Sequence, residues 1–365
     1  MTNVTGSSNE RAPLWSWAWT LLGAFALLAT LTGVLSGPVA TAVGVTVVGV
    51  VFAAVYHAEV VAHRVGEPFG TLVLAVAVTV IEVALIVSIM VEGGTDKAGL
   101  ARDTVFAAVM ITCSGIVGLC LLAGGVRHHV QGFQFQGALS ALAVLAPLTV
   151  LTLIVPNVTV SAPGAAFNVP QLVFAAIVSL VLYGAFVFVQ TIRHRDYFLP
   201  PEIGDEEAHA APPSTRATLV SLGLLIVSLV AVVGLAKALS PTLEGLVLRA
   251  GAPKAVVGII IAGLVLLPEG VAAYRAAQLD RLQTSMNLAL GSALASIGLT
   301  VPAVAVVSIL LGQPLQLGLG PKESVLLALT LLVSVITLGT GRTTVLQGVV
   351  HLSIFAAFLF YAVVP

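Results

Sequence analysis

The chain has 365 residues, of which 58% are hydrophobic and 8% are charged. A soluble domain carries about a quarter charged residues, so this chain has too few charges to cover a soluble protein of its size. Apolar runs of about 20 residues, long enough to cross a bilayer as a helix, recur along it. The formal net charge of −1 leaves no basic surface for nucleic acid. The composition predicts an all-α, polytopic membrane protein.

Hydrophilic segments divide the chain into five parts. A polar tail at 1–14, too weakly basic for a secretory signal, precedes a peripheral first transmembrane helix at 15–35. A first set of helices occupies 36–192. A hydrophilic linker at 193–216, rich in acidic residues, separates it from a second set at 217–365.

Eleven transmembrane helices are expected from the apolar stretches between charged residues, glycines and prolines. With the first helix set aside, each half contains five helices, and an odd number inserts the two halves with opposite topology. Alternating-access transporters are commonly built on such inverted repeats. The expected spans are 15–35, 39–62, 69–91, 104–125, 137–155, 171–192, 217–239, 255–277, 285–311, 323–338 and 343–364.

The two halves also resemble each other in their acidic residues. Glu59 precedes Glu82 by an interval similar to that between Glu244 and Glu269. This correspondence favours an internal repeat, and chance spacing in a glycine-rich sequence is the alternative.

Positive residues indicate the orientation. Counted over alternate loops, nine of the 15 Lys and Arg residues fall on one side and six on the other. Because cytoplasmic loops carry the excess of Lys and Arg, we expect a cytoplasmic N-terminus, a cytoplasmic linker and an external C-terminus.

Two carboxylates lie within apolar spans. Glu82 stands in the middle of one, where a charge costs about 3 kcal/mol on insertion scales. Glu269 follows Pro268, which removes a backbone donor, so a broken or kinked helix with free carbonyls is expected there. Each half thus places one carboxylate near the midplane. The alternative for each is a protonated, hydrogen-bonded packing residue.

Two carboxylates that meet in a region of low dielectric repel each other, so at least one holds a proton when no cation is bound. A hard cation with oxygen ligands, such as Ca²⁺, compensates both charges. Protons and cation then compete for the same oxygens, which gives obligatory exchange. No resident cofactor is expected, because the inorganic cations and protons are cargo.

Hydroxyl and amide side chains near these glutamates are candidate supporting ligands. The two serines among them recur, with Thr300, every four residues and so share one helix face. Packing through small residues is the alternative for the serines, and a bond to its own backbone is the alternative for the threonine. The candidates are Thr79, Asn287, Ser292 and Ser296.

His57, Glu59 and His63 lie near the expected cytoplasmic boundary. Since histidine titrates near physiological pH, they are candidates for a proton path or for regulation by pH. Interfacial anchoring is the alternative.

Other chemistries are disfavoured. Cys113 and Cys120 lie in one apolar stretch and fit small buried hydrophobes. The sequence has no phosphate-binding Gly-x-x-x-x-Gly-Lys-Ser/Thr motif, which argues against an ATP-driven pump. An intramembrane hydrolase would need a nucleophile with a positioned base, and no histidine lies near Ser292 or Ser296 in sequence.

The residues around both glutamates resemble the cation/proton exchanger branch of the calcium/cation antiporter superfamily, most closely its bacterial ChaA-type members. Residues 58–70, followed by Thr79-Val-Ile-Glu82, resemble the family's first α-repeat with the acidic helix that precedes it. Leu267-Pro268-Glu269, followed by 281–302, resembles the second.

This resemblance implies eleven helices, the first peripheral and the others forming two inverted five-helix repeats. The α-repeats would span 66–125 and 258–311. It also implies a cation site built by Glu82 and Glu269, a location in the bacterial inner membrane and no enzymatic activity.

The sequence lacks amide side chains that the family pattern has beside each glutamate. The usual Gly-Asn before each glutamate is absent, with Val78 and Thr79 before Glu82 and with Val265 and Leu266 before the second glutamate. Fewer amide ligands imply a looser, less calcium-selective site. The expected function is export of Ca²⁺, with Na⁺ or K⁺ as further substrates, in exchange for H⁺. The alternatives are a Na⁺(K⁺)/H⁺ antiporter with little Ca²⁺ transport and an uncoupled cation channel; oligomeric state is left open.

Overall fold

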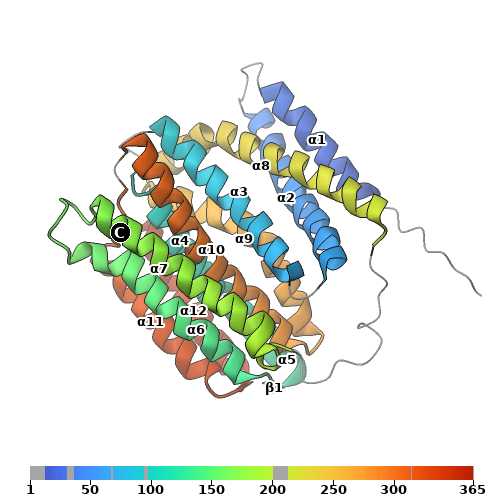
Figure 1. The fold of residues 1–365 in the computed structure, drawn as a ribbon, viewed down its shortest axis with the longest axis vertical. Coiled ribbons are helices and arrows are strands. Elements are labelled where there is room, and N and C mark those ends of the chain that lie inside the picture. The colour runs from blue at the N-terminus through green and yellow to red at the C-terminus, as the bar shows by residue number, and fades with distance from the viewer. Residues whose placement is uncertain are drawn as a thin grey trace, which may run out of the picture.

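The structure is a computed structural model of the chain, and it describes residues 13–30, 37–66, 69–93, 98–199, 213–313 and 315–364, without the side chains of 69–72 and 92–93. The described residues form a bundle of long helices (Figure 1). The expected acidic residues of the linker, between 202 and 207, lie outside the described residues.

Apolar stretches form the helices, several of which continue into π or 3-10 turns. The first half contains α1 (Leu14–Thr30), α2 (Pro38–Val65), α3 (Phe69–Gly93), α4 (Leu100–Met110), η2 (Ile111–Ile116), α5 (Val117–His128), α6 (Phe135–Thr149), η3 (Val150–Ile154), η4 (Val155–Asn157), α7 (Val169–Phe188), η5 (Val189–Arg193) and η6 (Arg195–Tyr197). The second half contains α8 (Thr215–Arg249), α9 (Ala255–Gln278), α10 (Leu282–Leu311), α11 (Pro321–Leu338) and α12 (Val345–Val363).

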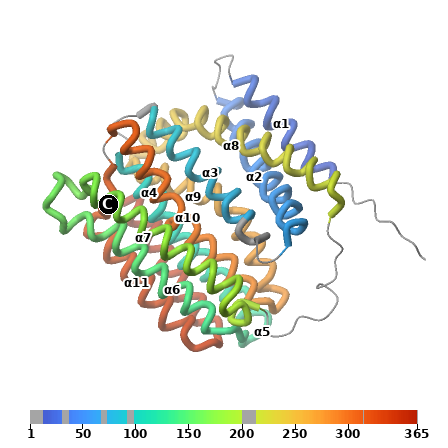
Figure 2. The backbone as a smooth tube through the Cα atoms, viewed as in Figure 1, coloured from blue at the N-terminus to red at the C-terminus, as the bar shows by residue number. Residues whose placement is uncertain are grey.

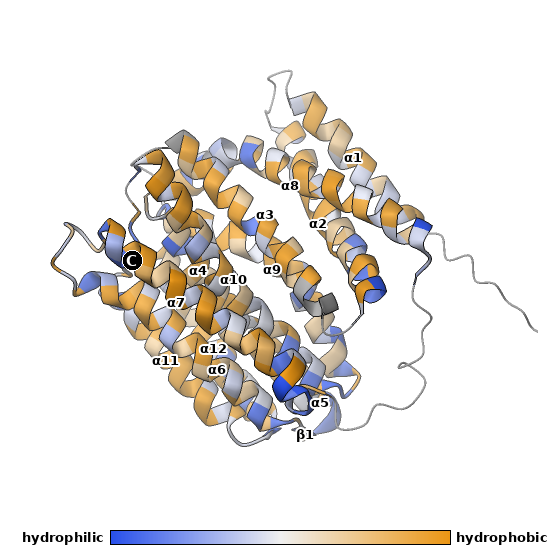
Figure 3. Ribbon diagram, viewed as in Figure 1, coloured by the Kyte–Doolittle hydropathy of each residue, from blue (hydrophilic) through white to orange (hydrophobic). Residues whose placement is uncertain are grey.

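Eleven helices cross the bundle, because α4, η2 and α5 form one continuous helix. Ten are long and apolar enough to span a bilayer, and α1 is a shorter apolar helix of 17 residues. The predicted fold class is confirmed: two inverted five-helix repeats, α2 to α7 and α8 to α12, follow an extra N-terminal helix. Apolar residues cover the helices, and hydrophilic residues gather mainly near their ends (Figure 3).

The two repeats are interleaved (Figure 2). Helix α2 packs along α8, α4 along α9, and α10 against both α3 and α7. Helix α1 lies at the edge of the bundle, against α2 and α8. Each glutamate-bearing helix is therefore in contact with helices of the opposite repeat.

Contacts between loops show which loops lie at the same end of the bundle. At one end, Arg64 donates to the carbonyl of Pro213 at 3.2 Å. Gln131 donates to Asp280 at 2.8 Å, and β1 (Gln131–Gly132) pairs antiparallel with β2 (Arg342–Thr343). The count of Lys and Arg residues assigned all of these loops to the same side of the membrane.

At the opposite end, Arg102 donates to the carbonyl of Gly318 at 3.3 Å. Ala166 and Gln316 form an isolated antiparallel bridge. These loops belong to the other side of the charge count, so the predicted grouping of loops agrees with the fold.

One predicted helix end and one predicted helix break were wrong. Helix α8 was expected to end at residue 239, but it runs through Pro241 to Arg249. Helix α9 was expected to be broken or kinked at Pro268, and it is not broken there, because it runs unbroken from Ala255 to Gln278. A proline inside a helix removes one backbone donor, and neighbouring helices that pack on both sides hold the remaining turns in place.

Candidate cation-binding site

Glu82 of α3 and Glu269 of α9 are buried, with exposed fractions of 2% and 7%. Each comes from a different repeat, and each lies well inside its helix. Helices α3 and α9 contact each other. The fold therefore brings together the two helices that carry the carboxylates singled out by the sequence.

Helix α10 supplies hydroxyl groups to the first of these carboxylates. The Ser296 hydroxyl donates to Glu82 Oε2 at 2.8 Å. Thr300, one turn further along α10, is also buried, and its hydroxyl oxygen has no hydrogen-bond partner among the described residues. Ser296, a member of the four-residue stripe on α10, thus contacts the glutamate of the opposite repeat.

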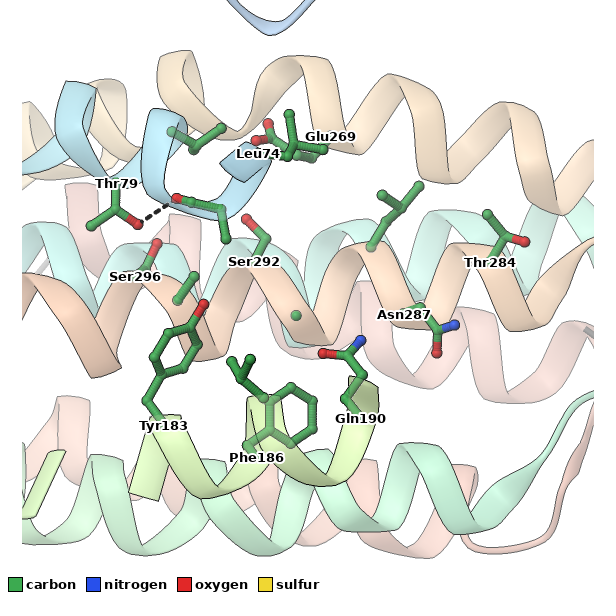
Figure 4. A pocket seen from close by; sticks show the side chains of 16 residues that line it. Leu74, Thr79, Tyr183, Phe186, Gln190, Glu269, Thr284, Asn287, Ser292 and Ser296 are labelled. Atoms are coloured by element: carbon green, nitrogen blue, oxygen red, sulfur yellow. Dashed lines mark hydrogen bonds between the residues drawn. The ribbon is translucent and has the colours of Figure 1, made fainter. Parts of the chain in front are cut away.

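A cavity of about 280 Å³ adjoins Glu269. On α10 it extends from Ser296 toward the N-terminal end of the helix, as far as Thr284, and Glu269 lies in its wall (Figure 4). Ser296 both lines this cavity and binds Glu82, so it connects the two carboxylates. The lining residues are Leu74, Ala75, Val78, Thr79, Tyr183, Phe186, Val187, Gln190, Glu269, Thr284, Asn287, Leu288, Gly291, Ser292, Ala295 and Ser296.

One oxygen of each carboxylate is left without a protein partner. Glu82 Oε1 and Glu269 Oε2 are buried, and neither has a hydrogen-bond partner among the described residues. Because buried polar atoms in proteins are almost always satisfied, the two unpaired oxygens, one of them on a side chain that lines the cavity, are unusual and need an explanation.

Thr79 and Ser292 line the same cavity. The Thr79 hydroxyl donates to the carbonyl of Ala75 at 2.8 Å, as the alternative interpretation anticipated. Its oxygen keeps lone pairs for a cation, because the bond to Ala75 uses only its proton. In Figure 4 the Ser292 hydroxyl lies on the side of α10 that faces Glu269.

Asn287 lines the cavity too, but its amide is already engaged. Its Nδ2 donates to the carbonyl of Phe198 at 2.6 Å, and its Oδ1 accepts from Gln283 Nε2 at 2.9 Å. Gln283 also accepts the backbone N–H of Gln134 at 2.7 Å. Asn287 therefore fastens the start of the linker to α10, and these contacts give no support to its predicted role as a ligand.

Sequence reasoning missed the wall that α7 and η5 contribute. Tyr183 and Gln190 point from this helix into the cavity (Figure 4). Gly298 of α10 allows the close approach, because a Cβ there would lie 2.7 Å from Tyr183 Cβ. The local sequence of α7 carries no signal for this role, since it depends on which helix packs against α10.

The three residues proposed for a proton path lie in different surroundings. His57 is fully buried and faces α8, where its Nδ1 lies 3.4 Å from Ser221 Oγ. His63 is exposed near the end of α2, whereas Glu59 lines a second cavity. The structure does not bring the two histidines to Glu59.

Cys113 and Cys120 are free and buried, as expected of small hydrophobes. No histidine is among the residues that line the cavity around Ser292 and Ser296. The described residues therefore offer these serines no histidine base, and the intramembrane hydrolase finds no support.

The fold and the match to a family model together define a membrane ion exchanger. The chain belongs to the family described as sodium/calcium exchanger protein, whose model matches residues 35–192 and 220–364. The two matched regions coincide with the two repeats and leave out α1 and the linker.

Two relatives cover most of the chain. It is 51% identical over 364 residues to the putative ionic transporter y4hA of Sinorhizobium fredii, covering 98% of each chain. It is 38% identical over 311 residues to the sodium-potassium/proton antiporter ChaA of Escherichia coli, covering 84% of each. The predicted resemblance is confirmed.

Solved structures share the fold at low sequence identity. Native YfkE aligns with a TM-score of 0.72 at 16% identity, covering 96% of this chain and 100% of that one. The H⁺/Ca²⁺ exchanger CAX aligns with a TM-score of 0.69 at 15% identity, covering 94% and 88%.

Proposed function

We propose that the protein is a secondary antiporter that exports Ca²⁺, with Na⁺ or K⁺ as further cargo, in exchange for H⁺. Glu82 and Glu269 bind the cation and the protons alternately. The observation that carries the proposal is the pair of buried carboxylates from inverted repeats, each with one oxygen that lacks a protein partner. The proposed function includes no enzymatic activity.

The ligand chemistry supports a hard cation. Two carboxylates balance a divalent charge, and the hydroxyls of Thr79, Ser292 and Ser296 add neutral oxygens, the ligand type that Ca²⁺ and alkali ions prefer. In place of the two amides of the family signature stand the hydroxyl of Thr79 and the apolar side chain of Leu266, which favours broader cation selectivity. Relatives support both cargo types, since ChaA is named for sodium, potassium and protons. An Aphanothece halophytica relative, 24% identical, is named a Ca²⁺/H⁺ antiporter.

We also propose a bacterial inner-membrane location with a cytoplasmic N-terminus and an external C-terminus. The cavity extends from the carboxylates toward the N-terminal end of α10. That end carries the loops richer in arginine, so this conformation opens to the cytoplasm.

Everted membrane vesicles test the proposal. A respiration-driven proton gradient, followed with a pH-sensitive dye, should collapse when Ca²⁺, Na⁺ or K⁺ is added to vesicles that contain the wild-type protein. Glu82→Gln and Glu269→Gln should abolish this response, because an amide neither carries the charge nor exchanges a proton. Full exchange by either variant would refute the carboxylate mechanism.

Glu323→Gln is the matched control. Glu323 lies at the start of α11, 3.4 Å from Lys322, and lines neither cavity. Loss of the Glu323 carboxylate should leave the rate of exchange within about twofold of wild type, because ion pairs near the surface contribute little to stability. A response to Na⁺ and K⁺ without Ca²⁺ would identify the monovalent antiporter, and cation flux without proton movement would identify a channel.

A further inference from the structure

A second cavity lies on another face of α9. Its volume is about 760 Å³, and α1, α2 and α9 form its walls. Pro268 and Arg275 of α9 line it, whereas Glu269 lines the first cavity. Helix α9 therefore separates the two cavities, with Glu269 at the boundary.

The walls are mostly apolar and aromatic, with one acidic and one basic side chain. Glu59 of α2 and Arg275 of α9 are both exposed to the cavity. Neither forms an ion pair within the part of the chain that the structure describes. The aromatic lining residues are Trp15, Trp19, Phe52 and Tyr56.

Glu59 shares the wall of the second cavity with Pro268, the residue that precedes Glu269 in α9. Glu269 Oε2 is buried and has no hydrogen-bond partner among the described residues. The second cavity therefore brings Glu59 to the helical turn that carries Glu269, although the two side chains line different cavities.

We propose that Glu59 relays protons between the cytoplasmic boundary and Glu269 through the second cavity, while cations use the first. This inference rests on the proposed exchange function. A cavity of about 760 Å³ has room for several waters, each of which occupies about 30 Å³. Its described lining offers side-chain oxygens only on Glu59 and Tyr56, too few for a metal ion, which takes about six or more oxygen ligands, whereas a proton needs only one carboxylate to accept it.

Few other titratable groups face Glu59. Among the residues that line the cavity, they are Tyr56 of its own helix and Arg275 of α9. Helix α1 contributes two tryptophans, which do not titrate, and His57 turns toward α8. Glu59 is thus the one carboxylate among the described lining residues.

Reconstituted proteoliposomes allow the proton step to be separated from the cation step. Glu59→Gln should slow proton-coupled exchange about a hundredfold, the scale of a lost proton-transfer group. Self-exchange of a radiolabelled cation against the same unlabelled cation needs no net proton movement and should stay within about twofold of wild type. Glu59→Asp should restore much of the coupled rate, and Glu323→Gln is the control.

Ala272→Leu provides a second variant that removes no charge. Ala272 lines the second cavity, so a larger side chain should narrow it and slow the coupled rate while self-exchange persists. A coupled rate near that of wild type in both variants would overturn the inference, and so would a parallel fall of both rates. A wild-type protein that moves no protons with any cation would instead refute the proposed function.

Discussion

The hydroxyl of Ser296 donates a hydrogen bond of 2.8 Å to the carboxylate of Glu82, across 214 positions of sequence. The donor belongs to the second repeat and the acceptor to the first. A movement of α10 relative to α3 must break or reorient this bond, so the ligand geometry depends on how the repeats are arranged.

Ser296→Ala should weaken cation binding. The substitution leaves Glu82 Oε2 without its donor, and hydrogen bonds to charged groups contribute about 1.5–3 kcal/mol. We expect the cation KM of exchange to rise by about tenfold or more. Initial rates in everted vesicles at graded cation concentrations measure this. Ser296→Thr keeps the hydroxyl and should retain most of the affinity; equal loss in both variants would indicate a steric effect.

Cation affinity should depend on pH with a definite sign. Protons and cation compete for the oxygens of Glu82 and Glu269, so raising the pH on the cytoplasmic side should lower the cation KM. Over the range where one proton competes, the change approaches about tenfold per pH unit. Uptake of labelled cation into everted vesicles at several external pH values checks this, and a KM that does not vary with pH would contradict competition.

Asn287→Ala should loosen the linker more than it weakens binding. The change removes the bond of 2.6 Å to the Phe198 carbonyl, so cleavage by a protease between 193 and 199 should become faster. The cation KM should stay within about twofold, because the amide is occupied in the structure. Limited proteolysis with mass spectrometry and KM measurements provide the two readouts. A large rise in KM with unchanged proteolysis would favour the ligand role.

Gly298→Ala should destabilise the contact between α7 and α10. A Cβ at this position would meet Tyr183 Cβ at 2.7 Å, and overpacking of this kind costs about 1–3 kcal/mol. We expect a lower Tm in detergent and slower exchange. Gly184→Ala is the matched control, because its Cβ would have no heavy atom within 4 Å. Similar Tm values for the two variants would contradict this account.

Much of the fold follows from single stretches of sequence. An apolar run of sufficient length must form a helix in a bilayer, because its backbone groups find no other partners there. The same constraint made Glu82 and Glu269 conspicuous, since carboxylates are rare inside such runs. The serine stripe was predictable because helical periodicity depends only on spacing.

The features that were missed depend on packing between distant segments. Tyr183 and Gln190 line the cavity because α7 packs against α10, and no local pattern encodes that pairing. The hydrogen bond from Asn287 to the Phe198 carbonyl likewise joins the linker to the second repeat. A helix end was expected before Pro241 and a break at Pro268, but tertiary contacts keep helices α8 and α9 continuous through these prolines.

Helix α1 has no counterpart in the second repeat, yet it places Trp15 and Trp19 in the wall beside Glu59. Two repeats in identical surroundings would present the same barriers from both faces of the membrane. The additional helix removes that equivalence, because it encloses the acidic residue of one repeat. Forward and reverse transport therefore need not share the same slow step, although the repeats are related by inversion.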